Sequence, residues 1–354
     1  MNMALIERPV AVRAATPGDA ARVTAFVDAH PDGTPFHLPA WNQAVARGCG
    51  QRAHVLIAEH GDGSLAGVLP LTEIHSPLFG RALVSTGFAV GGGVLAGGAG
   101  VARDLATAAW ALAERLSCPT VELRGGDEPG AKWQVASGHH LGHVRDLAAD
   151  DDAELLAIPR KQRAEVRKSL DFDLEVAVGT DARARREHYA VYAESVRNLG
   201  TPVFPASLFA EVLDRFGDAA DILTVRHRGV AVASVLSLYW RGTVYPYWGG
   251  GTHSARALRA NDRMYFALMG HARARGCTRF DFGRSKVGSG PAAFKRNWGF
   301  AGQPLTYFTR TADGAAPREI NPLSPKYRLQ IAAWQRLPLP VANAIGPWIA
   351  RGLG

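Results

Sequence analysis

The chain has 354 residues, of which 47% are hydrophobic and 20% are charged, and its formal net charge is +8. This composition is that of a globular protein, and the length allows two domains, each with its own core. The basic balance favours an anionic partner, such as a phosphate-bearing substrate, RNA or a membrane surface. Three widely spaced cysteines without a C-x-x-C motif argue against a disulfide framework and a zinc site. No signal-peptide core or long apolar run occurs, so we expect a cytoplasmic protein.

The first predicted elements are a strand and a helix in VAVRAATPGDAARVTAFV (10–27), with Thr16 as the expected helix N-cap. A hairpin follows in VLIAEHGDGSLAGVLPL (55–71), where two alternating strands flank a polar turn. A glycine triplet, a helix, a short strand and a glycine-containing segment complete this half, at 91–93, 102–116, 119–125 and 131–142.

The second half repeats this order of elements. Its hairpin, ILTVRHRGVAVASVLSL (222–238), places His227 where the first hairpin has His60. Agreement over about 100 residues predicts a duplicated α/β unit, with mixed and mostly antiparallel sheets flanked by helices. The stretch AADDDAE interrupts the pattern, which gives domains at 1–150 and 151–312 and a Pro-rich tail at 313–354. The glycine triplet, helix, short strand and glycine-containing segment of this half lie at 249–251, 261–276, 278–284 and 292–300.

Three glycine-containing motifs suggest phosphate loops, and none has the required context. GSGPAA (288–293) fits G-x-G-x-x-A, but Pro291 and Gly299 leave room for only about two helical turns. Gly283 and Gly288 have the glycine spacing of a Walker loop, but Ser289 follows where that loop has lysine. RHRGVA (226–231) matches the coenzyme A pyrophosphate loop of GNAT acetyltransferases in letters but falls in a hairpin turn, where no helix N-terminus offers its N–H groups. The order of elements is therefore GNAT-like, without the standard coenzyme A loop.

Several segments carry a more specific family resemblance. They are IPRKQRAEVRKS (158–169), SVRNLGTPVFP (195–205), PYWGGG (246–251), ANDRMY (260–265), FDFGRSKVGSGPAAFKRNWGF (280–300), the end of the tail (332–354) and, more loosely, FHLPAWNQ (36–43). With them the chain resembles the FemAB/FemX superfamily, and in particular the FemAB-like proteins associated with exosortase A and PEP-CTERM systems. STGFAVGGG (85–93) departs from the more polar version of that segment.

This resemblance implies tandem GNAT-like domains of FemAB type and an enzyme that transfers an acyl or aminoacyl group to an amine. It implies a role in exopolysaccharide or cell-envelope biosynthesis, with direct attack on the donor carbonyl. The donor stays open between aminoacyl-tRNA and acyl-CoA, bound as a substrate and not as a tightly held cofactor. Two alternatives also stay open: a coenzyme A-dependent N-acetyltransferase acting on a sugar or lipid-linked intermediate, and a catalytically silent scaffold that binds an envelope-assembly partner.

In GNAT-like folds the fourth and fifth strands splay apart, and their exposed N–H groups hold the acyl donor. The corresponding strands here are TVYPYWGG (243–250) and TRFDFGR (278–284). We therefore expect Tyr245, Tyr247 and Trp248 to line a substrate cleft, with an aromatic core as the alternative.

Lys295, Arg284 and Asp281 are the candidate catalytic residues. The resemblance gives Lys295 the role of stabilising transition-state charge or holding phosphate. Arg284 is expected to point into the same cleft. Asp281 is a candidate base, and a structural ion pair with Arg279 or Arg284 is the alternative interpretation.

Positive charge is concentrated in PRKQRAEVRKS (159–169), where three arginines share one helical face and Glu165 is the single acid. The stretch predicts binding to a substrate phosphate or a tRNA backbone, with a solvated face as the alternative. The expected contacts are Arg160, Arg163 and Arg167. Further on, Arg197 and Asn198 precede a Pro-bounded loop and are expected either to contact substrate or to form the turn.

His139, His140 and His143 invite a metal interpretation, but no acid or cysteine accompanies them at ligand spacing, so no metal is expected. The tail combines apolar residues such as Trp334 and Trp348 with arginines, and its prolines prevent one continuous helix. It is expected either to dock on the protein's own domains or to contact a membrane surface or membrane partner, which would make the protein membrane-associated.

Overall fold

The computed structural model describes residues 9–315 and 325–354, with the backbone alone at 325–328. The described chain forms two compact units that exchange segments. The first unit contains the described residues of Met1–Ser137 and Thr306–Ile320 together with Arg351–Gly354. The second contains Gly138–Leu305 and the described residues of Asn321–Ala350.

The sheet of the first unit has the strand order β1-β2-β3-β4-β6-β13, with the short β5 beside β3. Neighbours are antiparallel except β4 and β6, which run parallel. The expected hairpin is the β2–β3 pair. The strands are β1 (Val10–Ala14), β2 (Arg52–His60), β3 (Leu65–Ser76), β4 (Gly80–Ser85), β5 (Leu95–Ala96), β6 (Thr120–Arg124) and β13 (Gly302–Thr311).

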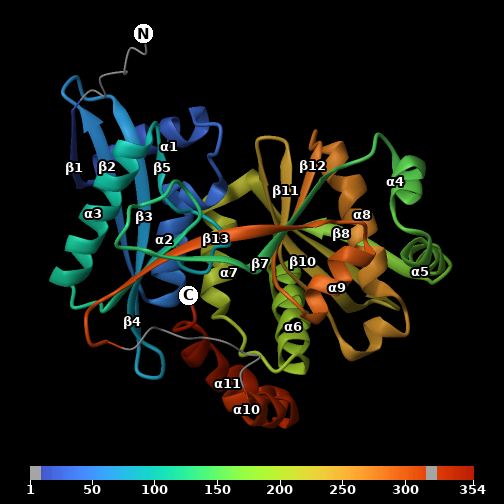
Figure 1. The fold of residues 1–354 in the computed structure, drawn as a ribbon. Coiled ribbons are helices and arrows are strands. Elements are labelled where there is room, and N and C mark those ends of the chain that lie inside the picture. The colour runs from blue at the N-terminus through green and yellow to red at the C-terminus, as the bar shows by residue number, and fades with distance from the viewer. Residues whose placement is uncertain (1–8, 316–324) are drawn as a thin grey trace. The chain divides into compact units, whose positions relative to one another are not determined.

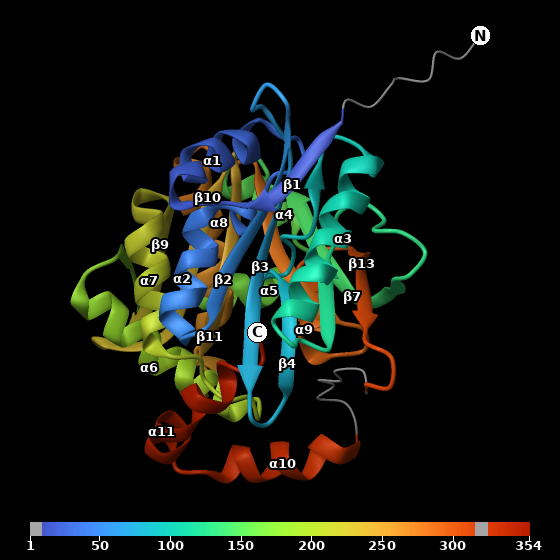
Figure 2. The same cartoon turned by 90° about the vertical axis from the view of Figure 1, so that its left-hand side faces the viewer.

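Helices cover both faces of this sheet, with α1 and α2 on one side and α3 on the other (Figure 2). α3 buries small and apolar residues at three- and four-residue spacing, including Leu105 and Ala109, against the sheet. Thr16 caps a 3₁₀ turn (Pro17–Asp19) and not α1 directly, because the turn inserts before the helix. The helices are α1 (Ala20–Ala29), α2 (Pro39–Cys49) and α3 (Ala99–Arg115).

The sheet of the second unit has the strand order β7-β12-β11-β10-β9-β8. β11 and β12 run parallel, and the other neighbours are antiparallel. The second expected hairpin is the β9–β10 pair, and RHRGVA lies at its turn as predicted. The strands are β7 (Gln134–Asp146), β8 (Leu174–Gly179), β9 (Ala220–His227), β10 (Val230–Trp240), β11 (Thr243–Gly251) and β12 (Arg279–Lys286).

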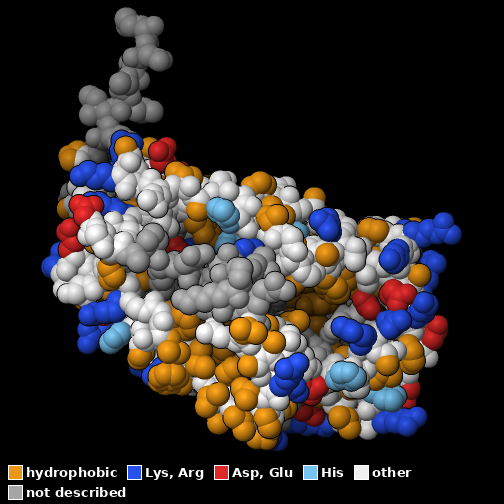
Figure 3. Space-filling model, turned by 60° about the horizontal axis from the view of Figure 1, so that its bottom comes forward, with side chains coloured by type: hydrophobic (Ala, Val, Ile, Leu, Met, Phe, Trp, Pro, Cys, Tyr) orange, Lys and Arg blue, Asp and Glu red, His pale blue; other side chains and the backbone are white. Residues whose placement is uncertain are grey.

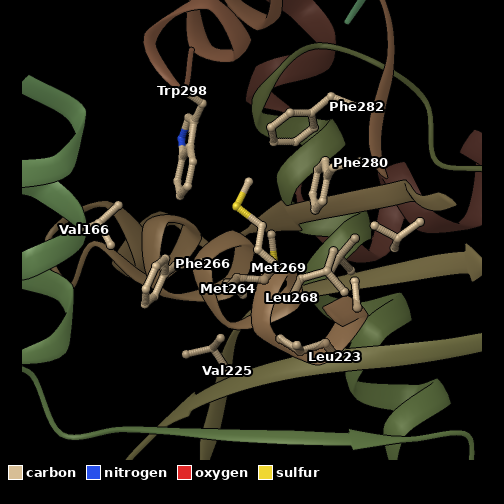
Figure 4. Packing of buried hydrophobic residues seen from close by; sticks show 14 of the residues in the cluster. Val166, Leu223, Val225, Met264, Phe266, Leu268, Met269, Phe280, Phe282 and Trp298 are labelled. Atoms are coloured by element: carbon tan, nitrogen blue, oxygen red, sulfur yellow. The ribbon is translucent and has the colours of Figure 1, made fainter. Parts of the chain in front are cut away.

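Alternation along β9 separates two packing layers. Leu223 and Val225 join a buried cluster with Met264 of α8 (Figure 4), whereas Thr224 faces α6 through the hydrogen-bonded pair of Ser234 and His188. α5 packs on α8, and α6 and α7 cover the opposite face (Figure 1). The helices are α4 (Asp151–Ala157), α5 (Arg160–Leu170), α6 (Ala182–Asn198), α7 (Ala206–Phe216), α8 (Ala260–Ala274) and α9 (Gly290–Asn297).

The duplicated architecture agrees with the expectation from the sequence, but the last strand of each copy belongs to the other copy's sheet. β7 ends the first repeat and pairs with β12, while β13 ends the second repeat and pairs with β6. The compact units therefore differ from the continuous ranges 1–150 and 151–312, because the exchange moves one strand across each boundary.

The described part of the tail forms α10 (Pro325–Arg336) and α11 (Leu339–Ala350), and both contact α6. The two helices are separated at Pro338, so the tail does not form one continuous helix, as its prolines predicted. Pro347 is nevertheless accommodated inside α11. Across residues 9–315 and 325–354 no helix combines the length and apolarity needed to cross a bilayer. Residues 325–350 of the tail therefore pack on α6 of the second unit.

Candidate active site

β11 and β12 are paired only where they begin. Thr243 pairs with Arg279 and Val244 with Phe280, and no other described residues extend this ladder, although the strands continue to Gly251 and Lys286. The strands therefore diverge from Tyr245 and Asp281 onward. Inside the opening, the ladder of backbone hydrogen bonds between these two strands is interrupted.

A β-bulge in each strand accompanies this divergence. In β11, Trp248 lies opposite Leu236 while Pro246 lies opposite Ser237, so Tyr247 is an extra residue. In β12, Asp281 and Arg284 lie opposite residues of β7 that are only two positions apart, so this strand also contains one extra residue. Bulges bend a strand and re-aim its side chains, which keeps the two strands apart.

Lys295 reaches the bulge of β12 from α9. Its Nζ donates hydrogen bonds to the carbonyl oxygens of Gly283 at 3.2 Å and of Arg284 at 2.9 Å. Ser289 caps the helix that carries it, because its hydroxyl accepts from the N–H of Ala292 at 3.4 Å. Burial lowers the pKa of Lys295 to about 8, although the nearby Asp281 carboxylate acts in the opposite direction.

Asp281 lies at the point where the strands separate. Its carboxylate accepts a hydrogen bond from the N–H of Gly283 at 2.8 Å, and burial nevertheless raises its pKa above the ordinary range. Arg279 pairs with Asp146 at 3.5 Å, so the expected structural ion pair between Arg279 and Asp281 is not formed. A buried carboxyl with a raised pKa has the property required of a general base near neutral pH.

Tyr245 stands beside Asp281 across the opening. The two residues follow the last paired positions of their strands, so alternation places them on the same face of the sheet. Burial, and then the charge of Asp281, raise the pKa of the Tyr245 hydroxyl above its usual value. The structure thus brings together Lys295, Asp281, Tyr245 and the backbone of Arg284.

His143, which the sequence brought up only in the metal interpretation, is a neighbour of this group. Its ring is buried, Nδ1 lies 3.3 Å from the carbonyl oxygen of Phe300, and within the described chain Nε2 has no hydrogen-bond partner. Burial lowers its pKa, and the charge of Lys295 lowers it further. The exchange of β7 into this sheet brings His143 here, and no local sequence pattern announces that exchange.

The other expected aromatic residues lie differently. Trp248 is 4% exposed and packs edge-on against Phe209 of α7, with ring centroids 4.9 Å apart, so the core alternative is confirmed for this residue. Tyr247 is partly buried, with its ring edge-on to Trp248 at 4.9 Å. Tyr247 occupies the bulge position itself, so it remains a candidate for lining the opening.

The arginine face of α5 is only partly available for an anion. Arg163 donates to the carbonyl oxygens of Ile158 and Leu156, which fixes it on its own chain. Arg160 and Arg167 are exposed. The predicted anion surface is therefore reduced to two arginines.

Arg197 and Asn198 contact the tail. The Arg197 guanidinium donates to the carbonyl oxygen of Gln335 at 3.0 Å, and the Gln335 amide donates to the carbonyl oxygen of Asn198 at 3.1 Å. These contacts hold α10 against the end of α6. They favour a structural role for both residues over the expected substrate contact.

The start of α8, where the resemblance places the pyrophosphate loop of a GNAT domain, carries one acidic side chain in its first turn. Asp262 lies in the first turn, and Gln162 donates to its carboxylate at 2.6 Å. Burial raises the pKa of Asp262 to about 6, and repulsion from Glu165 contributes. Arg259 at the N-cap is paired with Glu165. A carboxylate at this helix end disfavours a phosphate there.

In the first unit, the chain's own backbone fills the corresponding end of the sheet. The N–H of Gly93 donates to the carbonyl oxygen of Arg124 at 3.0 Å. The buried Arg124 guanidinium donates to the carbonyl oxygens of Thr86, Ala89 and Gly354. These contacts leave the first unit with a sealed strand end.

A metal site is not found in the parts of the chain that the structure describes. His143 is held against the Phe300 carbonyl and does not join His139 and His140 in a ligand set.

Comparisons with known proteins bear on the fold. A family model described as an acetyltransferase (GNAT) domain matches residues 158–296, and a search of curated proteins finds no match. The fold is similar to FemX, with a TM-score of 0.64 and 15% identity over 86% of this chain and 98% of that one.

Two further solved structures share the fold. L-PGS from Bacillus licheniformis has a TM-score of 0.54 and 13% identity over 90% of this chain and 98% of that one. A tandem GNAT protein from the clavulanic acid biosynthesis pathway has a TM-score of 0.53 and 12% identity over 87% of this chain and all of that one. The chain therefore has a mixed α/β fold like those of FemX and the tandem GNAT protein, and its residues 158–296 match the model of an acetyltransferase (GNAT) domain.

Proposed function

We propose that the opening between β11 and β12 is the site of acyl transfer to an amine, with an acyl or aminoacyl donor. The observation that supports this most directly is the divergence of the two strands after Val244 and Phe280, with Lys295 held at the bulge beside it. Acyl transfer needs an oriented donor carbonyl, a deprotonated amine and positive charge for the developing oxyanion. The site offers a group for each requirement.

In the proposed reaction, the substrate amine attacks the donor carbonyl carbon directly. A C–N bond forms, the carbon–sulfur or carbon–oxygen bond of the donor breaks, and the amine proton passes to Asp281, which returns it to the departing thiolate or ribose oxygen. The raised pKa of Asp281 suits it to accept that proton. Lys295, with a pKa of about 8, is mostly protonated at pH 7 and supplies the charge for the oxyanion. Tyr245 is proposed to orient the reacting groups beside Asp281.

The choice of donor follows from the charges around α8. Asp262 and Glu165 occupy the region where a GNAT domain holds the coenzyme A pyrophosphate. On the neighbouring α5, Arg160 and Arg167 stay exposed. This arrangement favours an anionic donor held through α5, such as aminoacyl-tRNA, over acyl-CoA in the usual position. The GNAT match at 158–296 keeps a coenzyme A-dependent N-acetyltransferase as the second candidate.

The resemblance of the motif segments to exosortase-associated FemAB-like proteins supports a place in exopolysaccharide or cell-envelope biosynthesis. The acceptor would then be an amine on a sugar or lipid-linked intermediate. The sealed strand end of the first unit supports assigning the chemistry to the second unit.

Native mass spectrometry of the full chain with acetyl-CoA, a long-chain acyl-CoA and charged tRNA tests the proposal. We expect retention of charged tRNA, weakened at least tenfold by Lys295→Ala. Arg296→Ala is the matched control, because Arg296 is the adjacent basic residue on α9 but is exposed. Retention of an acyl-CoA instead would select the N-acetyltransferase. If Lys295→Ala and Arg296→Ala retain every donor as the unmodified chain does, or if no donor is retained, the catalytic proposal fails and the scaffold function gains support.

A further inference from the structure

α11 presents large apolar side chains away from its own unit. Its inward residues are small: Ala342 and Ala350 are buried, and a Cβ on Gly346 would approach Val203 to 3.1 Å. Its outward residues are Val341, Ile345 and Trp348, with exposed fractions of 44%, 42% and 48%. These three positions lie at i, i+4 and i+7 and therefore form one helical stripe.

The stripe is unusual for a helix at a protein surface. Leu339–Ala350 contains no charged residue, and a helix that is apolar on all sides is normally buried. Leu329 of α10 adds a side chain that is 83% exposed. With the molecule's lower side turned forward, Figure 3 shows apolar side chains gathered into a broad patch. Contiguous apolar surface of this kind marks a site that another surface covers.

Charge indicates what covers it. Residues 325–350 contain Lys326, Arg328 and Arg336 and no aspartate or glutamate. Two copies meeting through residues 325–350 would bring together two segments that each have three basic residues and no acidic one, which disfavours self-association. Anionic headgroups would be attracted to the same charges, and a tryptophan on an apolar stripe is typical of the membrane interface.

We propose that the outward face of α10 and α11 docks on an anionic lipid surface. Each helix has 12 residues, too few to cross a bilayer, so the pair lies along the surface, with the apolar side chains inserted at headgroup level. The small inward residues keep α11 attached to the second unit during docking. This inference does not depend on the proposed acyl transfer.

Flotation of the full chain with vesicles tests it, using phosphatidylcholine alone and an equal mixture of phosphatidylcholine and phosphatidylglycerol. We expect binding to the mixed vesicles, at least fivefold less binding to phosphatidylcholine, and release at high salt. The double variant Ile345→Gln/Trp348→Gln should lose binding at least fivefold. Val230→Gln should not, because Val230 is similarly apolar and 66% exposed but lies at the β9–β10 turn.

The changed side chains point away from the core, so the melting temperatures of the variants should match that of the unmodified chain. Light scattering after size-exclusion chromatography gives the molar mass in solution and so tests the alternative, in which a second copy of the chain covers the face. A dimer that the double variant converts to monomer, without vesicle binding, would assign the face to a second copy and overturn the proposal. Failure to bind either vesicle, or equal binding by the double variant, would also overturn it.

Discussion

Lys295 carries a positive charge at a position where burial makes that charge costly. Its Nζ is held by two backbone carbonyls, and desolvation lowers its pKa from 10.5 to about 8. A lysine that only decorated a helix would keep an ordinary pKa in water. Asp281 lies beside it, and burial raises the pKa of that carboxyl, so the site combines a lysine of lowered pKa with a carboxyl of raised pKa.

This pKa makes a specific prediction for activity. If the Lys295 ammonium stabilises the oxyanion, its contribution is present below pH 8 and is lost as the pH rises through about 8, because the amine becomes neutral. In Lys295→Arg the guanidinium stays charged over this range. We therefore expect the kcat ratio of the unmodified enzyme to Lys295→Arg to fall about tenfold for each pH unit above 8.

Taking this ratio cancels the titration of the acceptor amine, which is common to both proteins. The measurement is steady-state kinetics from pH 6.5 to 9.5 with the donor identified by mass spectrometry. A ratio that rises through pH 8 would instead make the neutral Lys295 amine the active form.

At the scale of elements, the segment after β4 seals the first unit through a close approach of two glycines. A Cβ on Gly93 would lie 2.0 Å from the carbonyl oxygen of Gly125. Gly93→Ala must therefore displace backbone, and we expect it to lower the free energy of unfolding by about 2–3 kcal/mol. Gly91→Ala is the control, because nothing lies within 4 Å of its Cβ, and it should change the free energy by less than about 0.5 kcal/mol. Urea unfolding of both variants measures these free energies. Equal unfolding midpoints for Gly93→Ala and Gly91→Ala would contradict the sealing role of Gly93.

Local patterns predicted the elements, and long-range pairing set the limit of what could be predicted. The hairpins β2–β3 and β9–β10 follow from alternation and turn residues, which act over a few positions. The approach of Lys295 to β12 was also expected, since both lie within 21 residues of sequence, 280–300. The surroundings of His143 and Trp248 could not be predicted, because each depends on a distant segment: the exchange of β7 for His143 and the packing of α7 for Trp248.

At the scale of the whole molecule, the exchange of β7 and β13 makes each unit depend on the other repeat's chain. In the first unit β13 supplies the partner of β6, from Thr120↔Thr311 to Arg124↔Tyr307. In the second, β7 supplies the partner of β12. A chain cut between the repeats would leave β6 and β12 with unpaired edges, and such edges promote aggregation.

We therefore expect the fragments 1–150 and 151–354 to be poorly soluble and to lack a cooperative thermal transition when they are expressed alone. A first unit made from 1–137 joined to 306–315 should again show a cooperative thermal transition. A short Gly-Ser linker suffices, because the Ser137 and Thr306 hydroxyl oxygens are 3.3 Å apart. Phe308→Asp in the joined fragment is the control, since Phe308 belongs to the core that β13 completes. Circular dichroism melting compares the fragments. A fragment 1–150 that melts as cooperatively as the joined fragment would show that β6 does not need β13, and that the repeats fold as the continuous ranges of the sequence.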